Sequence, residues 1–430
     1  MEGSNQLINH KKERVLLISF FLFFISLFIT RLVYAYTAGM SVLGAVSLFY
    51  YTTYQEKVQL FRERNYLRFM FAFVVILIFS YIDSDNKSAG TQFLLRRIPL
   101  LIFPFTIGLI SLNKKQRDTI LLGAGIIVSI ACLASLGYAY YRYKLENNTV
   151  WLYNDALTHL IKQQSIYTSV LVNISVYSFV YYLLNYQLVG WKRLLLIIGT
   201  GFLLVISYLL ASRNMMLILY LTIFLFSLYI IIKRRKYIAG IGLLVAIGIG
   251  IAVIFIFFPK TINRFRELAF TQFNYESQAK ESHYAGNLTP DLWNGANFRL
   301  AAWPCGWQVF RQNPILGVGL GDKKDELFKV YREKNFTFAI STGKNVHNNY
   351  LDILMSTGLI GLFVFLMGWA ILPMIRVIRN RDAMGFLILL TFLLAMLTEN
   401  YFDRNLGAIL FGFFIPFILS IEKKSGSEFA

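Results

Sequence analysis

The sequence has few charged residues for its length, and this scarcity argues against an ordinary soluble fold. Asp, Glu, Lys and Arg make up 15% of the 430 residues, whereas 57% of the residues are hydrophobic. A soluble protein of this length does not need so much apolar surface. Apolar runs of about 20 residues, the length that crosses the core of a bilayer, recur along almost the whole chain. We therefore predict an all-α polytopic membrane protein.

Acidic residues and cysteines are scarcer still. The chain has 42 Lys and Arg against 23 Asp and Glu, and its formal charge of +19 raises the question of a nucleic-acid partner. The basic residues stand in short clusters between apolar runs, however, which indicates control of membrane topology and contact with anionic lipids. We therefore expect membrane lipids, and no nucleic acid, as partners. The two cysteines, Cys132 in an apolar run and Cys305 in a polar stretch, give no basis for a disulfide framework or a metal site.

Twelve segments are predicted to span the membrane: 15–31, 33–51, 66–82, 98–112, 119–140, 166–188, 193–211, 214–232, 237–258, 357–377, 383–399 and 406–421. With the N-terminus inside, the short basic links, such as NKKQRD, KRRK and RVIRNRD, fall on the inner side. The predicted organisation is a bundle of nine spans over residues 1–258, followed by one large, mostly helical outer loop over 259–356. Three further spans and a short inner tail occupy residues 357–430.

The outer loop contains a segment with helical periodicity, NGANFRLAAWPCGWQVFRQNP (294–314). Asn294 or Asn297 is expected to cap this helix, and the Asn-Pro pair at 313–314 to end it. Arg299 shares one helix face with three aromatic residues: Trp303, Trp307 and Phe310. A guanidinium among aromatic rings is expected to point into a lined cavity. The following stretch, DKKDELFKVYREKN (322–335), predicts a second helix with a solvated surface.

A histidine stands just before an apolar helical run, in the segment NVHNN (345–349). His347 or Asn348 is expected near the helix N-cap. The positive end of a helix dipole disfavours a charged imidazolium, and a neutral imidazole can act as a general base. The alternative is that His347 is only a capping residue at the membrane interface.

Four arginines lie at the outer ends of predicted spans or in the outer loop. Arg213 occupies a tight hairpin between spans, in SRN (212–214), while Arg96 and Arg97 end an outer link. Arginine stays protonated and directs two donors onto phosphate oxygens, but it can equally anchor a span at the interface. Both roles remain open for these three residues, whereas the aromatic face around Arg299 favours a functional role.

Three other polar motifs are less specific. The carboxylate pair DSD (83–85) has a form that can hold a divalent cation, but such pairs are common, and we predict no metal site. LGVGLGD (316–322) lacks the strand and helix context of a dinucleotide loop and is expected to be a flexible turn. TENYFDRN (398–405) predicts a salt-bridged turn between the last two spans, or part of the lining of an outer cavity.

Several of these motifs occur together in a recognisable order. NFRLAAW, NPILGVGLGD and HNNYLDILMSTGLIGLF, with the long loop and the Arg of ASRN, resemble the O-antigen ligase and polymerase superfamily. The resemblance implies an enzyme of the bacterial inner membrane that needs neither metal nor cofactor and whose site faces the periplasm. It also implies that Arg213, Arg299 and His347 are the catalytic residues. Three further residues are candidates for substrate contact: Arg96, Arg97 and Asn348.

The reaction that this resemblance implies is an inverting glycan transfer. The donor would be a glycan on undecaprenyl diphosphate, and the acceptor a sugar hydroxyl of lipid A-core, as in an O-antigen ligase. A repeat-unit polymerase and a protein O-oligosaccharyltransferase of the same superfamily are alternatives. A lipid-linked glycan transporter, from another class, should carry charges or broken helices near the bilayer midplane. The interiors of the predicted spans have almost no charged residues, which disfavours a transporter.

Overall fold

The computed structural model describes residues 2–29, 34–257, 262, 265–279, 281 and 289–422, without the side chains of 2–9, 254 and 268. The β-structure in these ranges is limited to two isolated bridges, Leu112–Ile421 and Glu281–Trp293. The α-helices, in chain order, are α1 (Glu2–Ser26), α2 (Ala35–Ala45), α3 (Tyr54–Glu63), α4 (Asn65–Asp83), α5 (Lys87–Arg97), α6 (Pro99–Thr106), α7 (Lys114–Glu146), α8 (Asn154–Leu157), α9 (Ser165–Asn185), α10 (Trp191–Leu210), α11 (Arg213–Arg234), α12 (Tyr237–Phe257), α14 (Gly295–Gln312), α15 (Lys323–Glu333), α16 (Thr337–Thr342), α17 (Asn349–Leu366), α18 (Leu372–Arg379), α19 (Ala383–Ala395) and α20 (Asn405–Leu419).

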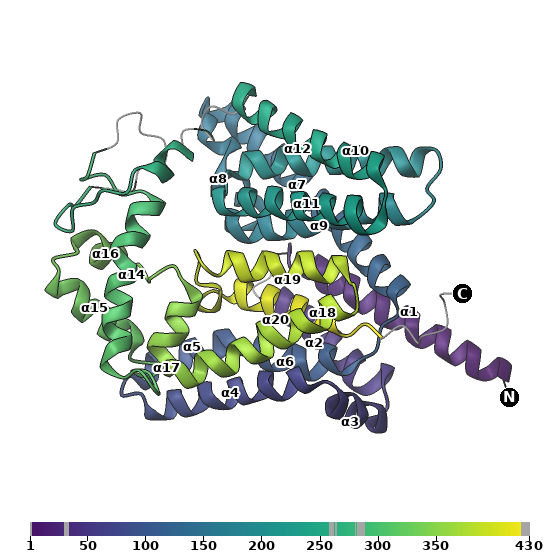
Figure 1. Ribbon diagram of the computed structural model, residues 1–430, viewed down its shortest axis with the longest axis horizontal. Coiled ribbons are helices and arrows are strands. Elements are labelled where there is room, and N and C mark those ends of the chain that lie inside the picture. Colours follow the sequence, from purple (N-terminus) through teal and green to yellow (C-terminus); the bar gives the residue numbers. More distant parts are fainter. Residues whose placement is uncertain are drawn as a thin grey trace.

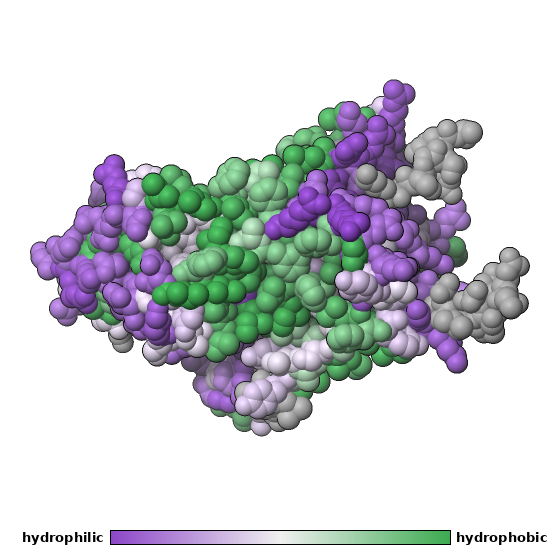
Figure 2. Space-filling view, turned by 90° about the horizontal axis from the view of Figure 1, so that it is seen from below, coloured by the Kyte–Doolittle hydropathy of each residue, from purple (hydrophilic) through white to green (hydrophobic). Residues whose placement is uncertain are grey.

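The helices have the length and the apolar surface of a multi-pass membrane protein. Within the described part of the chain, eight helical segments are long and apolar enough to cross a bilayer, and the shorter α19 and α20 are apolar as well. Within the described residues, each of the twelve predicted segments overlaps a helix, and their number as membrane spans stays a prediction. Figure 2 shows apolar residues across the middle of one face and polar residues gathered at its two ends. The all-α membrane fold is therefore confirmed.

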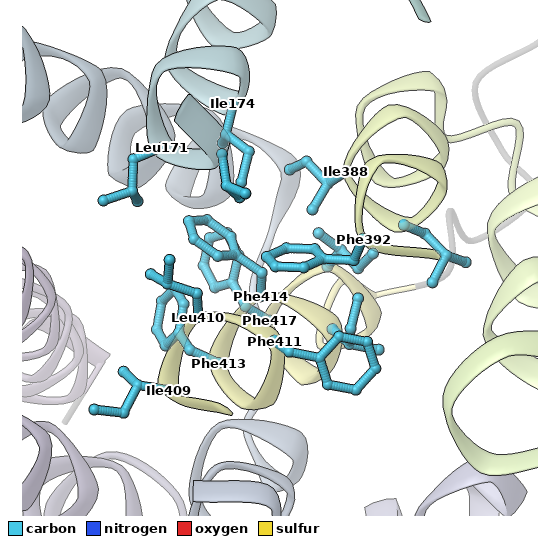
Figure 3. Packing of buried hydrophobic residues seen from close by; sticks show 14 of the residues in the cluster. Leu171, Ile174, Ile388, Phe392, Ile409, Leu410, Phe411, Phe413, Phe414 and Phe417 are labelled. Carbon is cyan, nitrogen blue, oxygen red and sulfur yellow. The ribbon is translucent and has the colours of Figure 1, made fainter. Parts of the chain in front are cut away.

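The helix α20 lies at the centre of the molecule. Figure 1 shows α17–α20 between an upper group, α7–α12, and a lower group that includes α2, α4 and α6. Every residue of α20 from Gly407 to Leu419 is buried. Its phenylalanines point outward in several directions (Figure 3), and Phe414 packs against Phe392 of α19 with ring centroids 5.9 Å apart. A helix that is apolar on all sides is accommodated in this way inside a bundle.

The helix α17 is broken near its middle, and the segment 314–318 pairs with the exposed backbone. Gly358 has φ +62° inside α17, where a helical residue would have a negative φ. The amide of Leu359 donates to the carbonyl of Pro314 at 2.9 Å, and the amide of Val318 donates to the carbonyl of Met355 at 2.8 Å. These bonds satisfy backbone groups that the break would otherwise leave unpaired. The turn predicted at 316–322 is present, but its hydrogen bonds to α17 and α4 oppose the predicted flexibility.

Gly317 should tolerate no side chain. It has φ +79°, and a Cβ there would lie 2.5 Å from the backbone of Ser356 and Thr357. We expect Gly317→Ala to lower the thermal unfolding midpoint of the purified protein strongly, since both the backbone conformation and the contact oppose alanine. The matched control is Gly343→Ala, which has φ +64° but no atom within 4 Å of its Cβ. It should cost only the conformational penalty of about 1–2 kcal/mol. Equal losses in the two variants would contradict the close packing of Gly317.

The helices α14–α16 gather at one end of the molecule, opposite the end where α1 begins (Figure 1). They have an aromatic cluster of their own, in which Trp293 stacks on Phe338 with ring centroids 5.6 Å apart. Leu351 and Met355 of α17 belong to the same buried cluster. This packing attaches the helices between α12 and α17 to the N-terminal half of α17, which His347 and Asn348 directly precede.

Candidate active site

The turn between α10 and α11 places Arg213 at the start of a helix. Ala211 adopts the left-handed conformation, with φ +46°, and Ser212 is the N-cap residue of α11. The predicted tight hairpin is thus confirmed. Arg213 is buried and donates from Nη1 to Oε2 of Glu267 at 3.2 Å. The neighbouring Asn214 donates to the hydroxyl of Thr398 at 2.7 Å, which connects this turn to the segment between α19 and α20.

Arg299 projects from the first turns of α14. Asn294 and Asn297 form a reciprocal capping box at the start of this helix, so both predicted caps take part. Arg299 donates to the carbonyl of Thr398 from Nε at 2.8 Å and from Nη2 at 2.5 Å, and Nη1 donates to the carbonyl of Gly295. Burial lowers the pKa of Arg299, and nearby carboxylates offset part of this effect. The guanidinium is therefore held in one orientation by backbone acceptors.

The two guanidinium groups meet over the first residue of α14. A Cβ on Gly295 would lie 2.7 Å from Nη2 of Arg213 and 3.0 Å from Nη1 of Arg299. Glycine leaves the space that lets both side chains approach the same point. The positive end of the α14 dipole lies there as well. Two fixed cations at a helix N-terminus make a place suited to a negatively charged group such as a phosphate.

His347 lies next to this pair and is connected to it through one carboxylate. Its Nδ1 is 3.2 Å from Oε2 of Glu399, and the same oxygen is 4.0 Å from Nη2 of Arg299. The imidazole also meets the ring of Phe298 edge-on, with centroids 5.6 Å apart. About 22% of the His347 side chain is exposed, so the ring is partly accessible. The structure thus brings together Arg213, Arg299 and His347, which are distant in the sequence.

Comparison with protein families places this region in a known group. Residues 198–366 match the family model described as O-Antigen ligase. This part of the chain is similar to the O-antigen ligase and polymerase superfamily. No curated protein matches the chain. The matched range runs from α10 to the end of α17 and contains all three residues of the convergent site. Members of this family are enzymes of the membrane glycosyltransferase type, and the similarity supports an enzymatic role for the chain.

Asn348, not His347, caps α17. The side-chain oxygen of Asn348 accepts hydrogen bonds from the amides of Tyr350 at 3.0 Å and Leu351 at 3.1 Å. His347 stands one residue earlier with φ +47°, and its own amide donates to the side chain of Asn345. Of the two roles left open by the sequence, capping thus belongs to Asn348. The imidazole of His347 is not used for it.

The two arginines at the end of α5 are held by different partners. Arg97 is buried and donates from Nη2 to Asp352 at 2.7 Å and to Asp403 at 3.5 Å. Arg96 is half-buried and donates to the backbone carbonyl of Asp403 at 3.3 Å. The charge of Arg97 is therefore compensated by two carboxylates. Its contacts place it in a buried ion cluster rather than in the arginine pair over Gly295.

The same cluster corrects the expectation for α15. Lys323 is only 2% exposed, although the sequence predicts a solvated helix there. Its ammonium donates to both carboxylate oxygens of Asp352, at 2.6 and 2.7 Å, and to Asp403 at 2.8 Å. Burial raises the pKa of Asp403, but Lys323 and Arg97 outweigh it, so this pKa lies below its ordinary value. We call these four residues, Arg97, Lys323, Asp352 and Asp403, the buried ion cluster.

Sequence reasoning included Thr398 and Glu399 in TENYFDRN, as a salt-bridged turn or part of the lining of an outer cavity, but it gave neither residue a partner. Thr398 and Glu399 contact Arg299 and His347, yet both lie outside the range that matches the family model. Glu267, the partner of Arg213, comes from a stretch without a marked motif. The polar stretch TENYFDRN between two apolar helices was the available signal for Glu399. Its pairing with His347 required the folded chain.

The DSD segment is attached through its backbone to Asp322, at the start of α15. Asp83 and Asp85 are both exposed, and the amides of Asp85 and Asn86 donate to the carboxylate of Asp322 at 2.8 and 2.7 Å. In the part of the chain that the structure describes, no three His, Cys, Asp or Glu side chains are grouped so that they could hold a metal. The cations that face the candidate site are arginines.

Proposed function

We propose that the chain is an O-antigen ligase of the bacterial inner membrane. It transfers a glycan from undecaprenyl diphosphate to a sugar hydroxyl of lipid A-core, at a site that faces the periplasm. Similarity to the family over residues 198–366 supports a lipid-linked glycan donor and a glycan acceptor. The observation that carries the proposal is the convergence of Arg213, Arg299 and His347 at the end of the molecule where α14–α16 gather.

The arginine pair has the chemistry to stabilise the leaving group. When the bond from the anomeric carbon to the diphosphate breaks, its electron pair stays on the diphosphate oxygen as negative charge. Arg213 and Arg299 are fixed and largely shielded from water, so they stabilise this charge better than solvent does. By analogy with the loss of one oxyanion-hole donor, each arginine contributes about 3–4 kcal/mol of transition-state stabilisation.

His347 has the chemistry to activate the acceptor. The hydroxyl oxygen attacks the anomeric carbon, and its proton moves to the free nitrogen of the imidazole. The partly exposed ring leaves one side open for the acceptor. The proposal contains one displacement and no protein nucleophile, so the configuration at the anomeric carbon is inverted. Two guanidinium groups supply the positive charge that the diphosphate needs, and the proposal therefore involves no metal ion.

Deletion of the gene in its host tests which acceptor the enzyme uses. For a ligase, we expect long glycan chains to accumulate on the lipid carrier while lipid A-core lacks them. Expression of the wild-type chain should restore attachment. Extraction of lipid-linked glycans and electrophoresis of surface glycolipid measure both species. Lipid A-core that carries single repeat units would instead indicate a polymerase. Normal glycolipid with loss of protein glycosylation would indicate a protein O-oligosaccharyltransferase.

A further inference from the structure

Glu399 is a nearly buried carboxylate in direct contact with the proposed base. Its side chain is 14% exposed, and Oε2 lies 3.2 Å from Nδ1 of His347. Burial alone would raise the pKa of Glu399, but attraction from His347, Arg299 and Arg404 lowers it below the ordinary value. The group is thus a carboxylate at neutral pH. An ionised carboxylate accepts hydrogen bonds and has no proton to donate.

We infer that Glu399 is a positioning residue that fixes the tautomer of His347 and stabilises the imidazolium formed during transfer. This inference rests on the proposed role of His347 as the base. A neutral imidazole carries one N–H, and a carboxylate beside Nδ1 places that N–H on Nδ1. Nε2 then keeps its lone pair for the proton of the acceptor hydroxyl. After that transfer the ring carries a positive charge, and Glu399 is the adjacent negative charge.

Glu399 lies closer to His347 than to Arg299, because Arg299 makes its hydrogen bonds elsewhere. Arg299 uses its short hydrogen bonds on the backbone carbonyls of Thr398 and Gly295, and it lies 4.0 Å from Glu399. By holding the carbonyl of Thr398, Arg299 fixes the backbone one residue before Glu399. The ring of Phe298 packs against the imidazole and restricts its rotation. Arg299 and His347 are therefore held in a fixed relative position, because both contact the dipeptide Thr398–Glu399.

Other charges near His347 are farther away or paired with each other. Lys344 pairs with Glu281 at 2.7 Å, and Asp403 reaches this region through the amide of Asn345 at 3.2 Å. Among the described residues, the charged groups that the contacts of this region bring near the His347–Glu399 pair include Arg213, Glu267, Glu281, Arg299, Lys344, Asp403 and Arg404. Glu399 is the carboxylate in hydrogen-bond contact with the ring. Its removal should therefore alter the protonation of His347 more than removal of any other carboxylate in this set.

The first experiment measures His347 without any turnover. The full-length protein in detergent is treated with diethyl pyrocarbonate, which modifies neutral imidazole, and the labelled peptide is quantified by mass spectrometry between pH 5 and 8. In Glu399→Gln, which keeps the size of the side chain, we expect the half-point of labelling to fall by about one pH unit, because the imidazolium loses its carboxylate. The control Glu333→Gln, at an exposed position of α15, should leave the curve unchanged. Glu399→Asp, which keeps the charge, should stay closer to the wild type than Glu399→Gln.

Transfer assays then distinguish this inference from the proposed function. We expect Glu399→Gln to lower kcat roughly 10- to 100-fold, as for loss of other groups that orient a reactive histidine, with little change in KM for the donor. An unchanged labelling curve in both Glu399 variants would overturn the inference. Full transfer by a variant without His347 would instead overturn the proposed role of His347 as the base, whatever the labelling of the wild-type histidine shows.

Discussion

Replacement of His347 by asparagine is expected to abolish measurable glycan transfer while the protein remains folded in the membrane. Asparagine accepts a hydrogen bond but cannot take up the proton of the acceptor hydroxyl, and loss of a positioned general base costs about 10²- to 10⁴-fold in rate. The position has φ +47°, a conformation that asparagine tolerates about as well as histidine. Transfer from a purified lipid-linked donor to lipid A-core, followed by electrophoresis, measures the loss.

The matched control is the same substitution at a histidine outside the site. His159 is exposed and stacks on Tyr138 with ring centroids 5.9 Å apart. His159→Asn should transfer glycan at the wild-type rate, and both variants should elute as folded protein in size-exclusion chromatography. Wild-type transfer by His347→Asn would exclude His347 as the base. The convergence with Arg213 and Arg299 would then need another explanation.

Local sequence patterns were sufficient for the elements of this fold. Apolar runs predicted the helices, SRN predicted the turn before Arg213, and the spacing of Asn294 and Asn297 predicted the start of α14. Each of these features depends on residues within a few positions of one another. Periodicity and capping are local properties, so a single sequence reports them directly.

The pairings that build the site are of another kind. His347 and Glu399 are separated by 52 positions, and Arg299 and Thr398 by 99. No periodicity relates such residues, because their contact depends on how separate helices pack. The roles of Arg213, Arg299 and His347 were expected from the family resemblance, and the structure adds which side chains hold them.

Two expectations of the sequence analysis, the flexibility of 316–322 and the solvated surface around Lys323, differ from the structure for the same reason. The three glycines of LGVGLGD, taken alone, predict a backbone that is free to change conformation. The break in α17 at Gly358 leaves backbone groups that hydrogen-bond to this part of the chain and hold it in place. The charged pattern around Lys323 likewise indicates a solvated helix, until carboxylates from two other segments surround the ammonium. In both cases, polar groups that the local sequence pattern would expose to solvent are bonded to residues from a distant part of the chain.

Replacement of Asp352 by asparagine should be among the most destabilising changes in the chain. Asp352 lies in the first turn of α17 and accepts from Lys323 at 2.6 Å and from Arg97 at 2.7 Å, and all three side chains are at most 3% exposed. Asparagine has a similar size but no charge, so two buried cations would share the remaining carboxylate, Asp403. Removal of one partner from a buried ion pair costs about 3–5 kcal/mol. The thermal unfolding midpoint of the protein in detergent measures the loss.

The control for this prediction is Asp325→Asn in α15, where the carboxylate is exposed and accepts from the side chain of Asn86. It should change the unfolding midpoint little, because exposed polar contacts contribute little. Adding Lys323→Met to Asp352→Asn removes one of the two uncompensated cations and should restore part of the lost stability. If Asp352→Asn is no more destabilising than Asp325→Asn, the buried ion cluster does not stabilise the fold.

The buried ion cluster is also connected to the proposed base. Its member Asp403 accepts a hydrogen bond from the side chain of Asn345, two residues before His347, so the cluster helps to position His347 as well as the helices. Loss of stability in Asp352→Asn should therefore be accompanied by a fall in transfer that the additional Lys323→Met change partly reverses.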